Sequence, residues 1–171
     1  MNEIDDLLGT CNNSNTNYYK NNYKEQNKRR NEAYKKIEMV AKQYGIKVYL
    51  ENNVISHANY ERFAHQNYLL MTDFDGFLEL RERMSFHLLL DVGHLYVSSH
   101  TLHKDFKEQC NLFDEYVEWL HVSENNGVAD EHSEIMCAIR KLMRKDRDIT
   151  LETNATMDEI IKSRKIIEKM W

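Results

Sequence analysis

The stretch FHLLLDVGH, at positions 86–94, decides the fold, because a short apolar run leads directly into an aspartate and then a histidine. Three other segments also run apolar and then end on a carboxylate or a histidine: KVYLE (47–51), WLH (119–121) and DITLE (148–152). Their terminal residues, Glu51, Asp91, His121 and Glu152, recur at intervals of 40, 30 and 31 residues. Each interval has the length of a strand plus a helix that crosses back over a sheet.

Helical patterns fill the intervals between these segments, and one more precedes the first. Strands are predicted at 46–50, 86–90, 119–122 and 149–151, a loop at 95–103, and helices at 18–44, 61–83 with a break near 73–76, 104–118, 133–144 and 157–170. Gly45 stands where a glycine commonly ends a helix, and Thr156 with Glu159 has capping-box spacing. Alternating strands and helices predict an α/β fold with a parallel sheet. The short strands favour a (βα) barrel of the TIM type, here a half-barrel of four βα units preceded by one helix.

The length of 171 residues indicates one domain, whereas a closed eight-stranded β/α barrel has about 250 residues. Residues 1–17 are rich in asparagine and predict an irregular leader, which leaves the domain at 18–171. No apolar run approaches the roughly 18 residues of a membrane span, and the first residues lack a secretory signal. We therefore expect a cytoplasmic protein with no membrane partner.

Net charge and cysteine content bear on the partners of the protein and on the redox state of its thiols. The net charge of -5 argues against nucleic acid as a partner. The three cysteines, Cys11, Cys110 and Cys137, are odd in number and have no CxxC spacing. We expect reduced thiols, with Cys110 and Cys137 packed inside helices.

The four strand-end residues together predict a divalent-metal site. In parallel β/α folds, functional side chains gather at the carboxyl ends of the strands. Three carboxylates crowded there would repel one another and lose hydration, and a bound divalent cation removes both penalties. Mixed carboxylate and imidazole ligands suit Zn²⁺, Mn²⁺, Fe²⁺ or Co²⁺ better than Ca²⁺. A single acid at a strand end is more often a helix cap or a salt bridge, so the recurrence in four segments carries this prediction.

A second group of candidate ligands follows two of these strands. His94 lies three residues after Asp91, and Asp130 and His132 alternate in the loop after the third strand. Alternate residues of an extended loop point the same way, so this pair suits a second ion or a substrate group, with His94 completing the set. The alternative is that Asp130 and His132 cap the next helix.

Four motifs in this order resemble a known superfamily. LENN (50–53), LDVGH (90–94), LHVSENNGVADEH (120–132) and LET (151–153) are similar to the second half of the xylose isomerase-like TIM barrels. That superfamily includes sugar phosphate isomerases and epimerases and the endonuclease IV-type enzymes. The resemblance covers about residues 30–171.

The resemblance implies a metal-dependent isomerase or epimerase that acts on a sugar or sugar phosphate. Glu51, Asp91, His121 and Glu152 would hold one metal, and His94 would contact substrate oxygens. Glu51 and Glu152 would also be the catalytic acid/base pair, transferring a proton through a metal-stabilised enediolate.

Two alternatives stay open beside this reading. In the endonuclease IV branch, Glu51 would bridge two metals, and His94, Asp130 and His132 would hold the second, for cleavage of abasic DNA. A catalytically inactive partial barrel is the other alternative. Half a barrel also leaves two sheet edges open, so we expect a homodimer or higher homo-oligomer, or a partner chain that completes the barrel.

Overall fold

The computed structural model describes residues 16–123, 133–152 and 155–170. The chain forms two compact units. One comprises the residues up to Val48 together with His57–Tyr68, and the other comprises Tyr49–Ser56 together with Leu69–Trp171. The leader predicted at 1–17 lies outside the described residues, except that its last two residues begin a helix.

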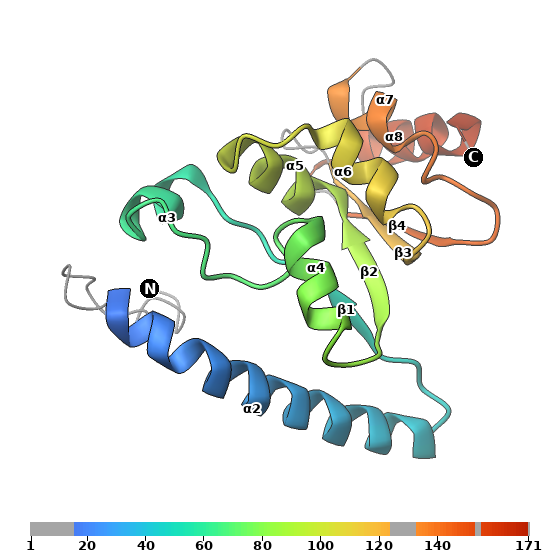
Figure 1. The fold of residues 1–171 in the computed structure, drawn as a ribbon. Coiled ribbons are helices and arrows are strands. Elements are labelled where there is room, and N and C mark those ends of the chain that lie inside the picture. Colours follow the sequence, from blue (N-terminus) through green and yellow to red (C-terminus); the bar gives the residue numbers. More distant parts are fainter. Residues whose placement is uncertain (1–15, 124–132, 153–154, 171) are drawn as a thin grey trace. The chain divides into compact units, whose positions relative to one another are not determined.

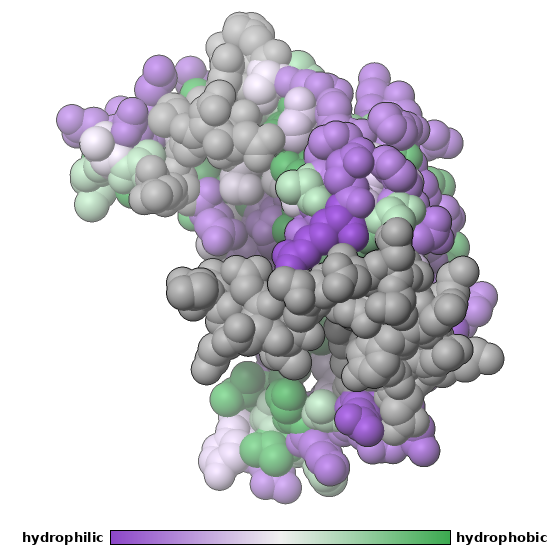
Figure 2. Space-filling view, turned by 90° about the vertical axis from the view of Figure 1, so that its left-hand side faces the viewer, coloured by the Kyte–Doolittle hydropathy of each residue, from purple (hydrophilic) through white to green (hydrophobic). Residues whose placement is uncertain are grey.

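The first unit is built around the long helix α2 (Thr16–Gln43), followed by the short helix α3 (His57–Arg62). The predicted glycine stop is confirmed, since Gly45 has a φ of 68° and the N–H of Ile46 donates to the carbonyl of Ala41 at 2.9 Å. The apolar side chains of α2 are only partly buried. Ala41 is buried, whereas Ile37 and Val40 each expose more than half of their surface. Figure 2 likewise shows hydrophobic residues gathered at the lower end of the face that it draws.

The second unit contains a parallel sheet with the strand order β1-β2-β3-β4. The strands are β1 (Tyr49–Glu51), β2 (His87–Asp91), β3 (Val117–Val122) and β4 (Asp148–Leu151). The strand order follows the chain order, so each strand lies beside the next one in the sequence (Figure 1). The predicted α/β fold with four parallel strands is therefore confirmed.

The helices of this unit are α4 (Phe74–Arg81), α5 (Val92–Thr101), α6 (Phe106–Phe113), α7 (Glu134–Ile139) and α8 (Met157–Met170). Three predictions for this region were wrong: residues 63–73 lie outside any helix although the helix was predicted at 61–83, the stretch 95–103 is mostly helix α5 rather than a loop, and the helix predicted at 104–118 ends at Phe113. Asp91 explains the helix, because its side chain caps the first turn. The polar residues Ser98 and Ser99, which read as loop in the sequence, are buried in this helix.

The two faces of the sheet differ in burial. Leu88, Leu90, Leu120 and Val122 have no exposed surface, and α5 packs on β2 and β3 over this face. Burial of each such side chain contributes roughly 1.5–3 kcal/mol. The alternate residues, among them Leu89 and Trp119, are half-buried on the opposite face. The strand-end acids therefore lie at the edge of a sheet that has one buried face and one half-buried face.

The described helices include none with both the length and the apolar character that crossing a membrane requires. Cys110 is buried in α6 as predicted, but Cys137 is exposed on α7, so its predicted packing role was wrong.

Candidate metal centre at the strand ends

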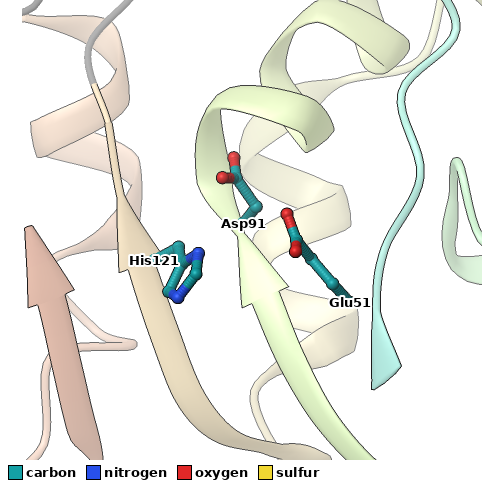
Figure 3. Close-up of side chains that lie close together, drawn as sticks. All are labelled: Glu51, Asp91 and His121. Atoms are coloured by element: carbon teal, nitrogen blue, oxygen red, sulfur yellow. The ribbon is translucent and has the colours of Figure 1, made fainter. Parts of the chain in front are cut away.

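Three of the four predicted ligands converge at the carboxyl edge of the sheet. Ligand atoms of Glu51, Asp91 and His121 all lie within 4.8 Å of one another. Figure 3 shows the three side chains together, with Asp91 between Glu51 and His121 at the ends of neighbouring strands. Ligands bonded to one ion at about 2.1 Å lie about 3–4 Å apart, so small side-chain movements would bring these three atoms to bonding distance.

Strand register explains why these side chains meet. Asp91 is the last residue of β2 and pairs with His121 on β3, while Glu51 ends β1 beside Leu89. Because the strands are parallel, their carboxyl ends share one edge, and residues at equivalent positions project from it together.

Asp91 has the most buried side chain of the three, with 2% of its surface exposed. One carboxylate oxygen, Oδ1, accepts a hydrogen bond of 2.8 Å from the backbone N–H of His94 and so caps α5. One oxygen of the carboxylate therefore stabilises the start of α5. Its other oxygen can accept a cation, which gives the residue a second role besides the cap.

His121 carries a polar atom that the fold does not satisfy. Its Nδ1 is buried and has no hydrogen-bond partner among the described residues, although a carboxylate oxygen of Glu152 lies 3.3 Å away. Buried polar atoms are nearly always hydrogen-bonded. This atom, together with two carboxylates of which one is almost fully buried, makes the donor set fit a divalent cation.

Glu152 lies beside the three-residue cluster rather than within it. Its backbone N–H donates to the carbonyl of Val122 at 3.0 Å, which extends the pairing of β3 and β4 by one residue. Its side chain is 61% exposed, and its nearest described contact in the cluster is the His121 ring. This contact is to Nδ1, the nitrogen without a hydrogen bond, so Glu152 lies beside the atom of His121 that is open to an ion.

His94 lies close to the cluster on the side of Glu51. Its Nδ1 is 3.3 Å from Oε1 of Glu51 and 3.0 Å from the backbone carbonyl of Asn52. A carbonyl oxygen can only accept, so this hydrogen bond places a proton on Nδ1 and leaves Nε2 available. Asp130 and His132 lie outside the described residues, so a second site that needs them stays a prediction.

Asn52, directly after Glu51, is the residue at this edge that the sequence analysis missed. Its side chain is buried and hydrogen-bonds to the backbone of Asp91. In the sequence, Asn52 is seen as an amide directly after a strand-ending acid. An exposed turn residue would give the same pattern, so the sequence does not predict that Asn52 is buried.

Another pair that the sequence did not predict lies on the half-buried face of the sheet. A register shift between β2 and β3 falls at the level of Glu118, and the Glu118 carboxylate approaches Nδ1 of His87 to 2.6 Å. His87 therefore forms a hydrogen bond with a side chain of the neighbouring strand. Tyr49 and Trp119 meet edge to face beside them, with ring centroids 5.3 Å apart.

Comparisons with family models, with curated proteins and with solved structures found no match for this chain. Its class is thus an α/β protein with a parallel four-stranded sheet and a carboxylate–imidazole cluster at the carboxyl edge.

Proposed function

We propose that this chain is a divalent-metal-dependent isomerase or epimerase of the xylose isomerase-like class, acting on a sugar or sugar phosphate. The observation that carries the proposal is the convergence of Glu51, Asp91 and His121 within 4.8 Å at the carboxyl edge of a parallel sheet. Two oxygen donors and one nitrogen donor suit Zn²⁺, Mn²⁺, Fe²⁺ or Co²⁺. Such an ion, when bound, polarises a substrate carbonyl.

The two glutamates carry the proton transfer in this proposal. Glu51 and Glu152 are 41% and 61% exposed, so both carboxylates are open to a substrate. They flank His121 and Asp91 from opposite edges of the sheet, β1 and β4. One would remove the proton beside the carbonyl, and the other would return a proton from the other side. Such general acid/base catalysis contributes typically 10²–10⁴-fold.

Isotope exchange tests this function without knowledge of the exact substrate. Metal-loaded protein is incubated in D₂O with five- and six-carbon aldoses, ketoses and their phosphates, and deuterium at the carbon beside the carbonyl is read by mass spectrometry. We expect exchange with the wild type, and none with Glu152→Gln although that variant still binds Co²⁺. Metal-loaded protein that exchanges none of these compounds would contradict the proposed activity.

The position of His94 supports a second candidate, a metal-dependent abasic-site endonuclease. Its Nδ1 lies 3.3 Å from Glu51, which would be the bridging ligand if two ions were bound. Cleavage of an oligonucleotide with one abasic site, in the presence of Zn²⁺ or Mn²⁺, would favour this function over the isomerase. An uncut oligonucleotide together with one ion per chain would favour the isomerase.

The proposed enzyme also needs its barrel completed. In the described sheet, β1 and β4 each pair on one side only, and one face is half-buried. We propose that a second copy of this chain supplies the missing strands, since exposed edges readily pair. Light scattering of the purified protein is expected to give a dimer or higher assembly. A stable monomer that turns over substrate would exclude this assembly.

A further inference from the structure

The side-chain amide of Asn52 joins the ends of β1 and β2. Nδ2 donates to the carbonyl of Asp91 at 3.0 Å, and Oδ1 accepts from the N–H of Asp91 at 2.6 Å. The last backbone pair between these strands is Glu51 with Leu89. The amide thus takes the place of the backbone groups that a longer β1 would offer, and it extends the strand pairing to the level of Asp91.

These two hydrogen bonds lie where water cannot replace them. Asn52 is 1% exposed and Asp91 is 2% exposed. If the amide is lost, both backbone groups of Asp91 lose their partner in a buried place, which costs free energy and lets the backbone move.

The segment after β1 is tied to α5 at two further points. The carbonyl of Asn52 accepts from Nδ1 of His94 at 3.0 Å, and the N–H of Ile55 donates to the buried hydroxyl of Ser98 at 3.1 Å. The side chain of Ile55 has no exposed surface. The segment is therefore held against the start and the middle of α5 by its backbone as well as by the Asn52 side chain.

Asn52 connects two candidate ligands, Glu51 and Asp91. It follows Glu51 directly in the chain, and its side chain hydrogen-bonds to the backbone of Asp91, which is 39 residues away in the sequence. Any displacement of its side chain changes the separation of these two carboxylates. Metal affinity depends on such surrounding hydrogen bonds, whose removal typically weakens binding 10–100-fold.

We propose that Asn52 is a positioning residue that sets the separation of Glu51 and Asp91 before a cation arrives. This inference rests on the proposed metal site and adds a residue that binds neither metal nor substrate. Its effect is preorganisation: the two oxygens already face one another, so less ordering accompanies binding.

The test compares Asn52→Leu with the wild type by titration with Co²⁺, followed by calorimetry and by visible absorption. Leucine is similar in shape to asparagine and adds no charge, so the net charge of the cluster stays unchanged. We expect Co²⁺ to bind at least about ten-fold more weakly, with an altered absorption band. Asn52→Ser, which is too short to reach both Asp91 groups, should weaken binding as well and serves if the leucine variant does not fold.

Gln109→Met supplies the matched control. Gln109 is also buried, and its side-chain oxygen accepts from the N–H of Phe74 at 2.9 Å, 35 residues away. This variant loses a buried long-range hydrogen bond in the same unit but away from the cluster. We expect a comparable fall in Tm and unchanged Co²⁺ affinity.

The outcomes separate the two proposals. Wild-type protein that binds no Co²⁺ would remove the metal site itself and this inference with it. Wild-type protein that binds Co²⁺, together with a folded Asn52 variant of equal affinity and spectrum, would overturn the positioning role alone. The positioning role is supported if the Asn52 variants lose affinity while Gln109→Met does not.

Discussion

The two sides of the candidate metal centre are built differently. On the side of β1 and β2, Asp91 is 2% exposed and its backbone and side chain together make three short hydrogen bonds. On the side of β4, Glu152 is 61% exposed, and its contact with the cluster among the described residues is with His121, at 3.3 Å. A ligand must be held in place, whereas a group that carries protons must be able to move. In the proposed enzyme, the first side would hold the cation, and Glu152 on the second side would be free to transfer a proton.

The largest expected effect is a loss of folding stability when the contacts of Arg147, just before β4, are removed. The Arg147 side chain is 3% exposed, pairs with Oδ1 of Asp114 at 2.9 Å and donates to the carbonyl of Leu142 at 2.9 Å. Arg147→Met should lower the free energy of unfolding by about 3 kcal/mol, because the Asp114 carboxylate and buried carbonyls lose their partner. Urea denaturation measures this loss. A much smaller loss would mean that the start of β4 is as loosely held as Glu152.

Arg144→Met is the control for this experiment, since Arg144 is half-exposed, pairs with Asp146 on the surface at 2.9 Å and lies farther from Asp114, at 3.8 Å. We expect little change in stability. The Arg144 guanidinium, hydrogen-bonded to Asp146, lowers the pKa of that carboxyl to about 2. The variant should therefore raise the pKa of Asp146 toward its ordinary value, which NMR titration can follow.

Next in size is the loss of metal binding when the buried carboxylate is neutralised. Asp91→Asn should weaken Co²⁺ binding about 100-fold or more, because a charged ligand is removed. Asparagine is an equally good helix cap, so Tm should change little. Asp105→Asn is the matched control: Asp105 caps α6 with a 2.7 Å hydrogen bond from the N–H of Glu108. Equal Co²⁺ affinity in both variants would place the cation elsewhere.

A smaller effect is expected on the exposed side of the centre. Glu152→Gln should weaken Co²⁺ binding by only about ten-fold, because the exposed Glu152 carboxylate lies beside the three converging ligands and is not one of them. The sequence predicted Glu152 as a direct ligand, and the same titration decides between the two roles. A loss as large as that of Asp91→Asn would make Glu152 a direct ligand and remove the contrast between the two sides.

Thiol reactivity probes the helices behind the sheet with the smallest perturbation. Burial raises the pKa of Cys110 on α6 to about 12, and the nearby Asp105 adds to this shift. At pH 8 about one thiol in 10⁴ is then ionised, so Cys110 should react only on unfolding. Cys137 on α7 is exposed and should react in the native state. Mass spectrometry after alkylation of a Cys11→Ser variant checks this, and rapid labelling of Cys110 would contradict a closed core.

The sequence was sufficient for the fold class because the relevant signals are local. An apolar run that ends on an acid, a helical repeat and a glycine stop each depend on neighbouring residues. Helix α8 was predicted at its observed bounds, and Thr156 with Glu159 forms hydrogen bonds of 2.7 and 2.8 Å at its start. Helix α5 was missed because its polar residues Ser98 and Ser99 are buried inside the fold, where the Ser98 hydroxyl accepts a hydrogen bond from the N–H of Ile55.

By itself, the sequence determined the alternation of strands and helices and brought Glu51, Asp91 and His121 to one edge, because parallel strands end on the same side. Only the tertiary structure decided what each residue does there. Whether an amide is buried, as in Asn52, or a carboxylate stays exposed, as in Glu152, depends on residues about 30 to 40 positions away. Strand register and long-range hydrogen bonds set those neighbours, and a local pattern contains no information about either.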